Sequence, residues 1–126
     1  MKHSPTIVGA LLGLLFIFFS VMVLSGKAPA QKIPEGTPTF HFMAAFGPTG
    51  YMTFIKVLEL IGGILTAIPK TRNFGLLILG PIVVNIIAFH QFVSGDLLKQ
   101  PMVIGIGVVS AYLLWAGRRN FAALKN

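Results

Sequence analysis

The chain has 126 residues, of which 55% are hydrophobic and only 10% are charged, and its mean hydropathy is +0.83. A soluble domain carries about 25% charged residues because its surface must be solvated, so this composition excludes an ordinary soluble globule and a disordered chain. The net charge of +7 does not indicate a nucleic-acid partner, because the cations lie at the ends of apolar runs. The absence of Cys excludes disulfides and thiolate chemistry within this chain.

Four apolar runs are long enough to predict membrane helices, because a helix needs about 20 residues to cross a hydrocarbon core of about 30 Å. They cover residues 6–25, 51–68, 74–93 and 101–117. We therefore expect an all-α fold, an integral membrane four-helix bundle that forms a single domain over residues 1–126. The lipid bilayer is then the principal partner of the chain.

The distribution of charge predicts the orientation of this bundle. With four crossings, both termini and the turn at 69–73 share one side, which carries six cations and no acid: Lys2, Lys70, Arg72, Arg118, Arg119 and Lys125. The other side carries three cations and two acids: Lys27, Lys32, Lys99, Glu35 and Asp96. Because cytoplasmic loops carry the excess of Lys and Arg, we expect both termini inside.

A signal peptide is the alternative reading of the first run. Lys2 is followed by an apolar stretch and by Ala28-Pro29-Ala30, which resembles an A-x-A cleavage site. The apolar stretch of about 19 residues is longer than a signal core of 7–15 residues, which favours a membrane helix. Cleavage after Ala30 would leave three crossings and an external N-terminus.

One long loop, residues 27–50, is expected on the extracytoplasmic side. Pro29, Pro34 and Pro38 keep its first half from forming a helix. Residues 40–46 (FHFMAAF) predict either a short helix in the membrane interface or a loop that packs on the bundle through its aromatic rings.

Four polar side chains within the predicted spans are the candidate site: Lys56, Glu59, Asn85 and His90. An ionisable group at mid-membrane costs about 2.5–3.5 kcal/mol, so such groups usually mark function. Lys56 and Glu59 are i, i+3 neighbours on one helix face. Depth along the antiparallel neighbouring helices predicts that all four form one polar cluster in the outer half of the bundle.

The role of these four residues has two alternative interpretations. They can simply satisfy each other's hydrogen bonds as structural glue, or they can bind a quinone head group, a small polar ligand or a proton. Lys56 can also extend to the interface and leave Glu59 with Asn85 alone.

Small residues predict where helices approach closely. Gly9 and Gly13 form a small-xxx-small motif, and Gly62 and Gly63 lie beyond the charged pair. Pro81 should kink the third span one turn before Asn85 and free a carbonyl group.

No catalytic motif and no metal site is evident. His90 is the single histidine within a span, so a haem with two axial ligands would need His41 from the outer loop. Three acids cannot furnish a rich metal site, and no nucleotide-binding or hydrolase motif occurs. Nothing in the sequence indicates a self-sufficient enzyme.

Residues 50–63 (GYMTFIKVLELIGG), the basic turn 70–72 and residues 80–90 (GPIVVNIIAFH) resemble the DoxX family of small four-helix membrane proteins. The resemblance covers about the last 80 residues. Many members carry an Arg in the first helix, whereas this chain has no basic residue between Lys2 and Lys27. The resemblance implies a bacterial inner-membrane protein associated with redox complexes, and some relatives are named as subunits of a terminal quinol oxidase.

Three functions follow as hypotheses. The first is an accessory subunit of a quinol-linked redox assembly, with quinone as its ligand and other membrane redox subunits as partners. The second is a small transporter or proton-conducting module, which would require a homo-oligomer because one bundle has little room for a channel. The third is a purely structural membrane scaffold.

Overall fold

The computed structural model describes residues 3–28 and 32–125, and all regular secondary structure in these residues is helical. The helices are α1 (Ser4–Leu24), α2 (Pro38–Phe46), α3 (Tyr51–Ala67), α4 (Arg72–Ala88), α5 (Pro101–Ala116) and α6 (Arg118–Ala122). Short turns join them: η1 (Pro69–Thr71), the π-helical turn η2 (Phe89–Val93), which continues α4, and η3 (Leu97–Lys99). The expected all-α class is confirmed.

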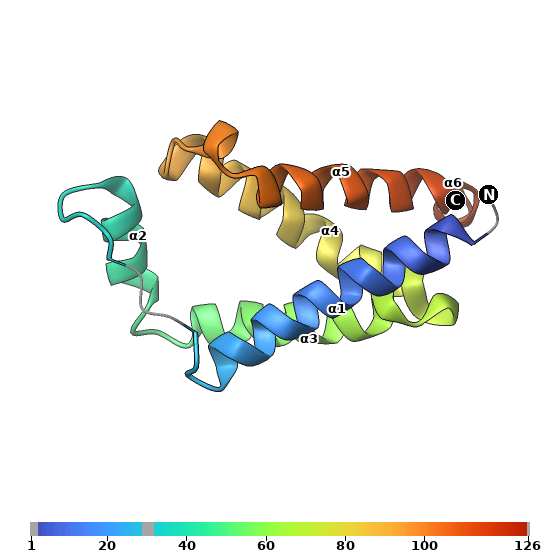
Figure 1. The fold of residues 1–126 in the computed structure, drawn as a ribbon, viewed down its shortest axis with the longest axis horizontal. Coiled ribbons are helices and arrows are strands. Elements are labelled where there is room, and N and C mark those ends of the chain that lie inside the picture. Colours follow the sequence, from blue (N-terminus) through green and yellow to red (C-terminus); the bar gives the residue numbers. More distant parts are fainter. Residues whose placement is uncertain (1–2, 29–31, 126) are drawn as a thin grey trace.

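Figure 1 shows how these helices are arranged in space. Helices α1, α3, α4 and α5 run along the longest axis, and the start of α1 lies at the same end as α6. Helices α3 and α4 diverge toward the opposite end, where α2 lies apart from the other helices. The segment with the two alternative readings is therefore a helix, which begins with Pro38 and is capped by Thr37, whose hydroxyl accepts from the Phe40 amide.

Two helices are long and apolar enough to cross a membrane: α1, with 21 residues, and the continuous stretch Pro69–Val93, with 25 residues. A third is added if α2 and α3, which are bent by 88° at their junction, count as one span. Helix α5 is apolar but has only 16 residues. The four-crossing topology stays a prediction, and the suggested cleavage site at Ala30 and the terminal Lys2 lie outside the described residues.

The core is narrow, and most of the apolar surface faces outward. Helix α1 buries one stripe at helical spacing: Gly9, Leu12, Gly13, Phe16 and Ser20. The other helices contribute Leu76, Leu79, Ile82, Val83 and Leu113. In contrast, Leu11, Phe18, Phe74 and Val84 are each more than half exposed. Such continuous apolar exposure is costly in water and is what a bilayer accommodates.

Glycine allows α1 and α3 to touch through their backbones. A Cβ atom on Gly13 would lie 2.5 Å from the carbonyl oxygen of Gly63 and 2.6 Å from the backbone nitrogen of Ala67. A Cβ on Gly9 would meet the Arg72 side chain at 2.8 Å. The small residues that the sequence singled out on these helices thus lie against their neighbours, as close backbone approach requires.

The α3–α4 contact also depends on small residues. A Cβ on Gly62 would lie 2.8 Å from the Leu79 side chain, and a Cβ on Gly75 of α4 would lie 2.7 Å from the Gly62 carbonyl oxygen. Pro81 lies inside α4, where its nitrogen cannot donate to the carbonyl group of Leu77. Helices α3 and α4 are therefore in close contact near Gly75 and diverge toward the end of the molecule where α2 lies.

Candidate functional site

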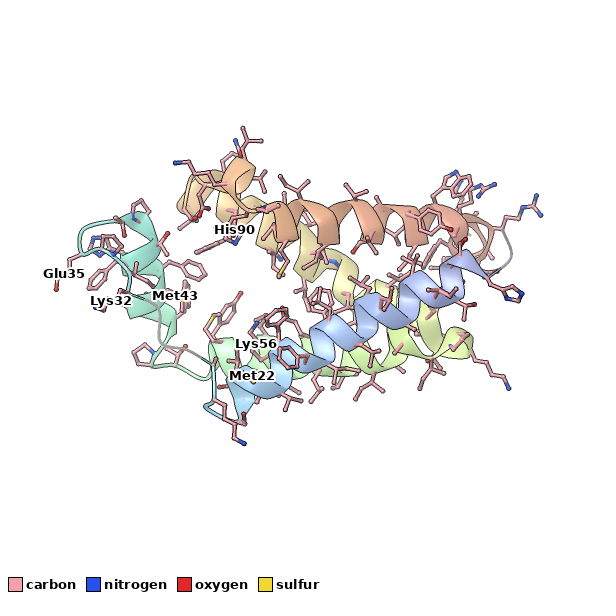
Figure 2. The ribbon with its side chains drawn as sticks, in the orientation of Figure 1. Met22, Lys32, Glu35, Met43, Lys56 and His90 are labelled. Carbon is pink, nitrogen blue, oxygen red and sulfur yellow. The ribbon has the colours of Figure 1, made fainter. Side chains whose placement is uncertain are left out.

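A cavity of about 590 Å³ occupies the end of the molecule where α3 and α4 diverge. Its walls come from α2, α3, α4, η2 and the segment that leads to α5. All four polar residues singled out in the sequence line it: Lys56, Glu59, Asn85 and His90. In Figure 2, Lys56 on α3 and His90 in η2 lie on different sides of this space, and Met43 of α2 lies on a third. The volume falls within the range usual for small-molecule sites.

The α3 wall carries a buried ion pair. Lys56 Nζ lies 2.9 Å from Glu59 Oε2, because residues three apart in a helix project from the same face. Glu59 is 3% exposed, whereas the Lys56 side chain is 22% exposed. Glu59 Oε2 accepts no hydrogen bond of good geometry from a described residue, so the ammonium group is its compensating charge. The negative charge of the buried carboxylate is therefore compensated by Lys56.

The opposite wall carries a second pair, which joins His90 to Asp96. His90 Nδ1 lies 2.8 Å from Asp96 Oδ1. Asp96 also accepts hydrogen bonds from the Ser94 hydroxyl and, at 3.0 Å, from Gln100 Nε2. The hydrogen bonds from Ser94, His90 and Gln100, in that order of effect, hold the pKa of Asp96 well below its usual range. The carboxylate is therefore ionised at neutral pH and is a strong acceptor.

The chain reaches this geometry through the way α4 ends. In the π-helical turn η2 the Ser94 amide donates to the Phe89 carbonyl oxygen at 2.9 Å. Gly95 then adopts a φ of +71°, which glycine tolerates and other residues resist. The chain reverses direction at Gly95, so the Asp96 amide donates to the His90 carbonyl oxygen at 2.9 Å. The same reversal brings the Asp96 carboxylate next to the His90 imidazole.

The polar residues therefore form two separate pairs around one cavity. His90 is paired with Asp96, and no hydrogen bond joins it to Lys56 or Glu59. Asn85 lines the cavity without a side-chain hydrogen bond to another described residue. The divergence of α3 from α4 separates the two walls at this end.

Asp96, the partner of His90 in the second pair, and its hydrogen-bond donors Ser94 and Gln100 also line the cavity but are not among the four site residues that the sequence predicted. Asp96 was counted only as a loop charge. The signal that could have found it is Gly95 directly before an acid, six residues after His90, since a glycine that ends a helix turns the next residue back toward the last turn.

Aromatic rings close the side of the cavity next to α2. Phe42 of α2 packs edge-on against Phe89, with ring centroids 5.0 Å apart, and Phe46 lies 5.0 Å from Tyr51. Phe42, Phe89 and Tyr51 all line the cavity. Helix α2 is thus held over the opening by contacts with both α3 and η2.

The remaining lining determines what the cavity can bind. Ile55, Ile82 and Ile86 form an apolar part of the lining, beside the Lys56–Glu59 and His90–Asp96 pairs. No three His, Asp or Glu side chains in residues 3–28 and 32–125 lie close enough to hold a metal ion. His41, the second histidine of the haem hypothesis, is exposed on α2 and does not line the cavity. The arrangement suits a small organic molecule with an apolar ring and polar ends.

Comparisons with known proteins place the chain among its relatives. No protein-family model matches the sequence, and no solved structure matches it. The uncharacterized protein YwoB of Bacillus subtilis (strain 168) is 32% identical over 121 aligned residues, which cover 87% of this chain and 77% of YwoB. At this identity and coverage, the chain belongs to the same family as YwoB.

Proposed function

We propose that the chain is a multi-pass protein of the bacterial inner (plasma) membrane, with four crossings and both termini inside. Helices α3 and α5 lie alongside the two longer spans and expose apolar side chains such as Phe54 and Val108. Their 17 and 16 residues correspond to about 25 Å, and a bilayer adapts to a mismatch of a few ångströms. The positive-inside rule supports the orientation, because the end with η1 and α6 carries the larger share of cations.

Within this topology, the cavity lies in the outer half of the bundle and binds the head group of a quinone. The observation that carries this proposal is one cavity with an apolar, aromatic lining, an ion pair in one wall and a hydrogen-bonded His–Asp pair in another. A quinone head group is a flat apolar ring with oxygen atoms at opposite ends. The Lys56 ammonium can donate to one oxygen, and the rings of Phe42 and Phe89 can contact the ring faces or edges.

A binding role fits this site better than independent catalysis. The ionisable groups of the cavity are paired with each other, Lys56 with Glu59 and His90 with Asp96. In line with the resemblance to the DoxX family, we assign the chain to an accessory, quinone-binding subunit of a redox assembly. Its partners would supply the redox centres.

Binding of duroquinone (tetramethyl-1,4-benzoquinone) to the full chain in mild detergent tests this proposal by equilibrium dialysis. We expect saturable binding that weakens about tenfold or more in Lys56→Met, because a hydrogen bond to a charged group contributes about 1.5–3 kcal/mol. Lys99→Met is the matched control, since Lys99 is exposed and does not line the cavity. Absence of saturable binding, or equal weakening in both variants that remain folded, would contradict the proposal.

A further inference from the structure

We propose that the His90 wall of the cavity selects the hydroxyl-bearing, reduced form of the ligand, by accepting a hydrogen bond from a quinol hydroxyl group at Nε2. This inference rests on the proposed function and adds the redox state of the bound molecule. It concerns binding alone and involves no electron transfer by this chain.

The first step fixes the tautomer of His90. Three donors converge on the Asp96 carboxylate, so the carboxylate is the acceptor in each of these contacts. Nδ1 of His90 must then carry a proton. A neutral imidazole has one N–H group, so its Nε2 is a hydrogen-bond acceptor. Nε2 makes no hydrogen bond to a described residue, and the ring lines the cavity.

The second step concerns the hydrogen-bond donors and acceptors that the other lining residues present to a ligand. Lys56 can only donate, and the Glu59 carboxylate, which is 3% exposed, is its counter-ion. Ser94 and Gln100 are engaged by Asp96, and the Asn85 amide can serve as donor or acceptor. A ligand that pairs with both walls therefore presents an acceptor to Lys56 and a donor to His90.

The third step compares the two forms of a quinone with this pattern. A quinol has hydroxyl groups at both ends of its ring, and a hydroxyl can donate to Nε2 while the other accepts from Lys56. A quinone has only carbonyl acceptors, so its second oxygen would face the lone pair of Nε2. A site built to pair with a hydroxyl rejects the analogue that lacks it, because the polar group of the protein is left unpaired.

The dissociation constants of duroquinol and duroquinone for the full chain, measured under anaerobic conditions at pH 8, test this inference. We expect duroquinol to bind about tenfold or more tightly than duroquinone. His90→Asn retains an amide that can donate to Asp96 in place of Nδ1 but has no atom at the position of Nε2. It should bring the ratio of the two constants close to one. His90→Gln, which places an amide at the end of the side chain, should retain part of the preference.

His41→Asn is the matched control, because His41 is exposed on α2 and does not line the cavity. It should keep the ratio of the parent protein. Equal binding of both forms by the parent protein would overturn the inference and leave the proposed quinone site standing. Binding of neither form would overturn both. The ratio in the parent protein decides the inference even if a His90 variant does not fold.

Discussion

His90 and Asp96 lie 2.8 Å apart, from Nδ1 to Oδ1, although one ends a membrane-length helix and the other follows it in a turn. The pair is therefore built by one continuous segment and needs no second helix. Lys56 and Glu59 likewise belong to α3 alone. A substitution in one pair therefore leaves the residues of the other pair in place.

The Asp96 carboxylate should stabilise the fold in a pH-dependent way. Its folded pKa lies below the ordinary value of 3.8, so its contribution is present above that value and is lost as pH falls toward the folded pKa. Asp96→Asn should lower the melting temperature at pH 7, and the difference from the parent protein should narrow as pH falls below about 4.

Thermal unfolding in detergent, followed by circular dichroism between pH 3 and pH 7, measures this difference. Glu35→Gln is a suitable control, because Glu35 is exposed and Figure 2 shows it at the outer edge of the molecule, away from the cavity. A difference between parent and Asp96→Asn that stays constant over this range would show that the charge of the carboxylate is not what stabilises the turn.

The Lys56–Glu59 pair should respond asymmetrically to removal of either partner. Lys56→Met leaves a buried carboxylate without its counter-ion and should lower the free energy of unfolding by about 3 kcal/mol. Glu59→Gln should cost less, about 1 kcal/mol, because the partly exposed lysine can reach toward the polar interface.

The double variant Lys56→Met/Glu59→Gln completes the cycle and should be more stable than Lys56→Met alone, since no charge then remains buried. Unfolding in mixed detergent micelles gives the three free energies. A Glu59→Gln variant less stable than Lys56→Met would refute the dependence of Glu59 on the lysine.

The sequence predicts the position of a site residue where helical spacing and depth along the helix determine its neighbours. Lys56 and Glu59 are three residues apart on one helix face, and the sequence predicts Lys56, Glu59, Asn85 and His90 in the outer half of the bundle; the structure places all four around one cavity. The partner of His90 could not be derived in this way. It depends on the π-helical turn and on the positive φ of Gly95, which are properties of a particular turn.

The separation of the two pairs was also beyond the sequence. Whether α3 and α4 stay in contact or diverge depends on which small residues meet at the crossing. The sequence marks Gly62 and Gly63, but it does not say that Gly75 is the residue that faces Gly62. Similar limits apply to α2, where both a helix and a packed loop were compatible with the same aromatic pattern.

The contact of α1 with α3 should be sensitive to a single methyl group. In Gly13→Ala the new Cβ would meet backbone atoms of Gly63 and Ala67, which cannot move without separating the helices. We expect a loss of about 1–3 kcal/mol in the free energy of unfolding. Gly105→Ala is the matched control in α5, because no atom lies within 4 Å of its Cβ position.

The control should gain stability, by about 0.5–1 kcal/mol, since alanine restricts the unfolded chain more than glycine does. Both variants add the same methyl group to an apolar helix, so the opposite signs isolate the effect of the contact. Equal effects in the same unfolding assay would contradict the close approach of α1 and α3.

The proposed topology can be tested with single cysteines, because the natural sequence contains none. Ser25→Cys, Lys70→Cys, Leu98→Cys and Ala123→Cys follow α1, α3, α4 and α5 respectively, and all four positions are exposed. A membrane-impermeant maleimide applied to intact cells, or to spheroplasts where an outer layer blocks access, should label the cysteines at 25 and 98. Those at 70 and 123 should react only after permeabilisation.

The pattern of labelling separates this topology from the alternatives. If α1 and the Pro69–Val93 stretch were the only crossings, position 70 would be labelled from outside and position 98 from inside. If α2 and α3 crossed as one bent span but α5 did not cross, position 123 would be labelled from outside. Protection of both 70 and 123 in intact cells, together with labelling of 25 and 98, therefore requires that α3 and α5 each cross, despite their 17 and 16 residues. That result would also place the cavity, which opens at the end with positions 25 and 98, on the outer side of the membrane.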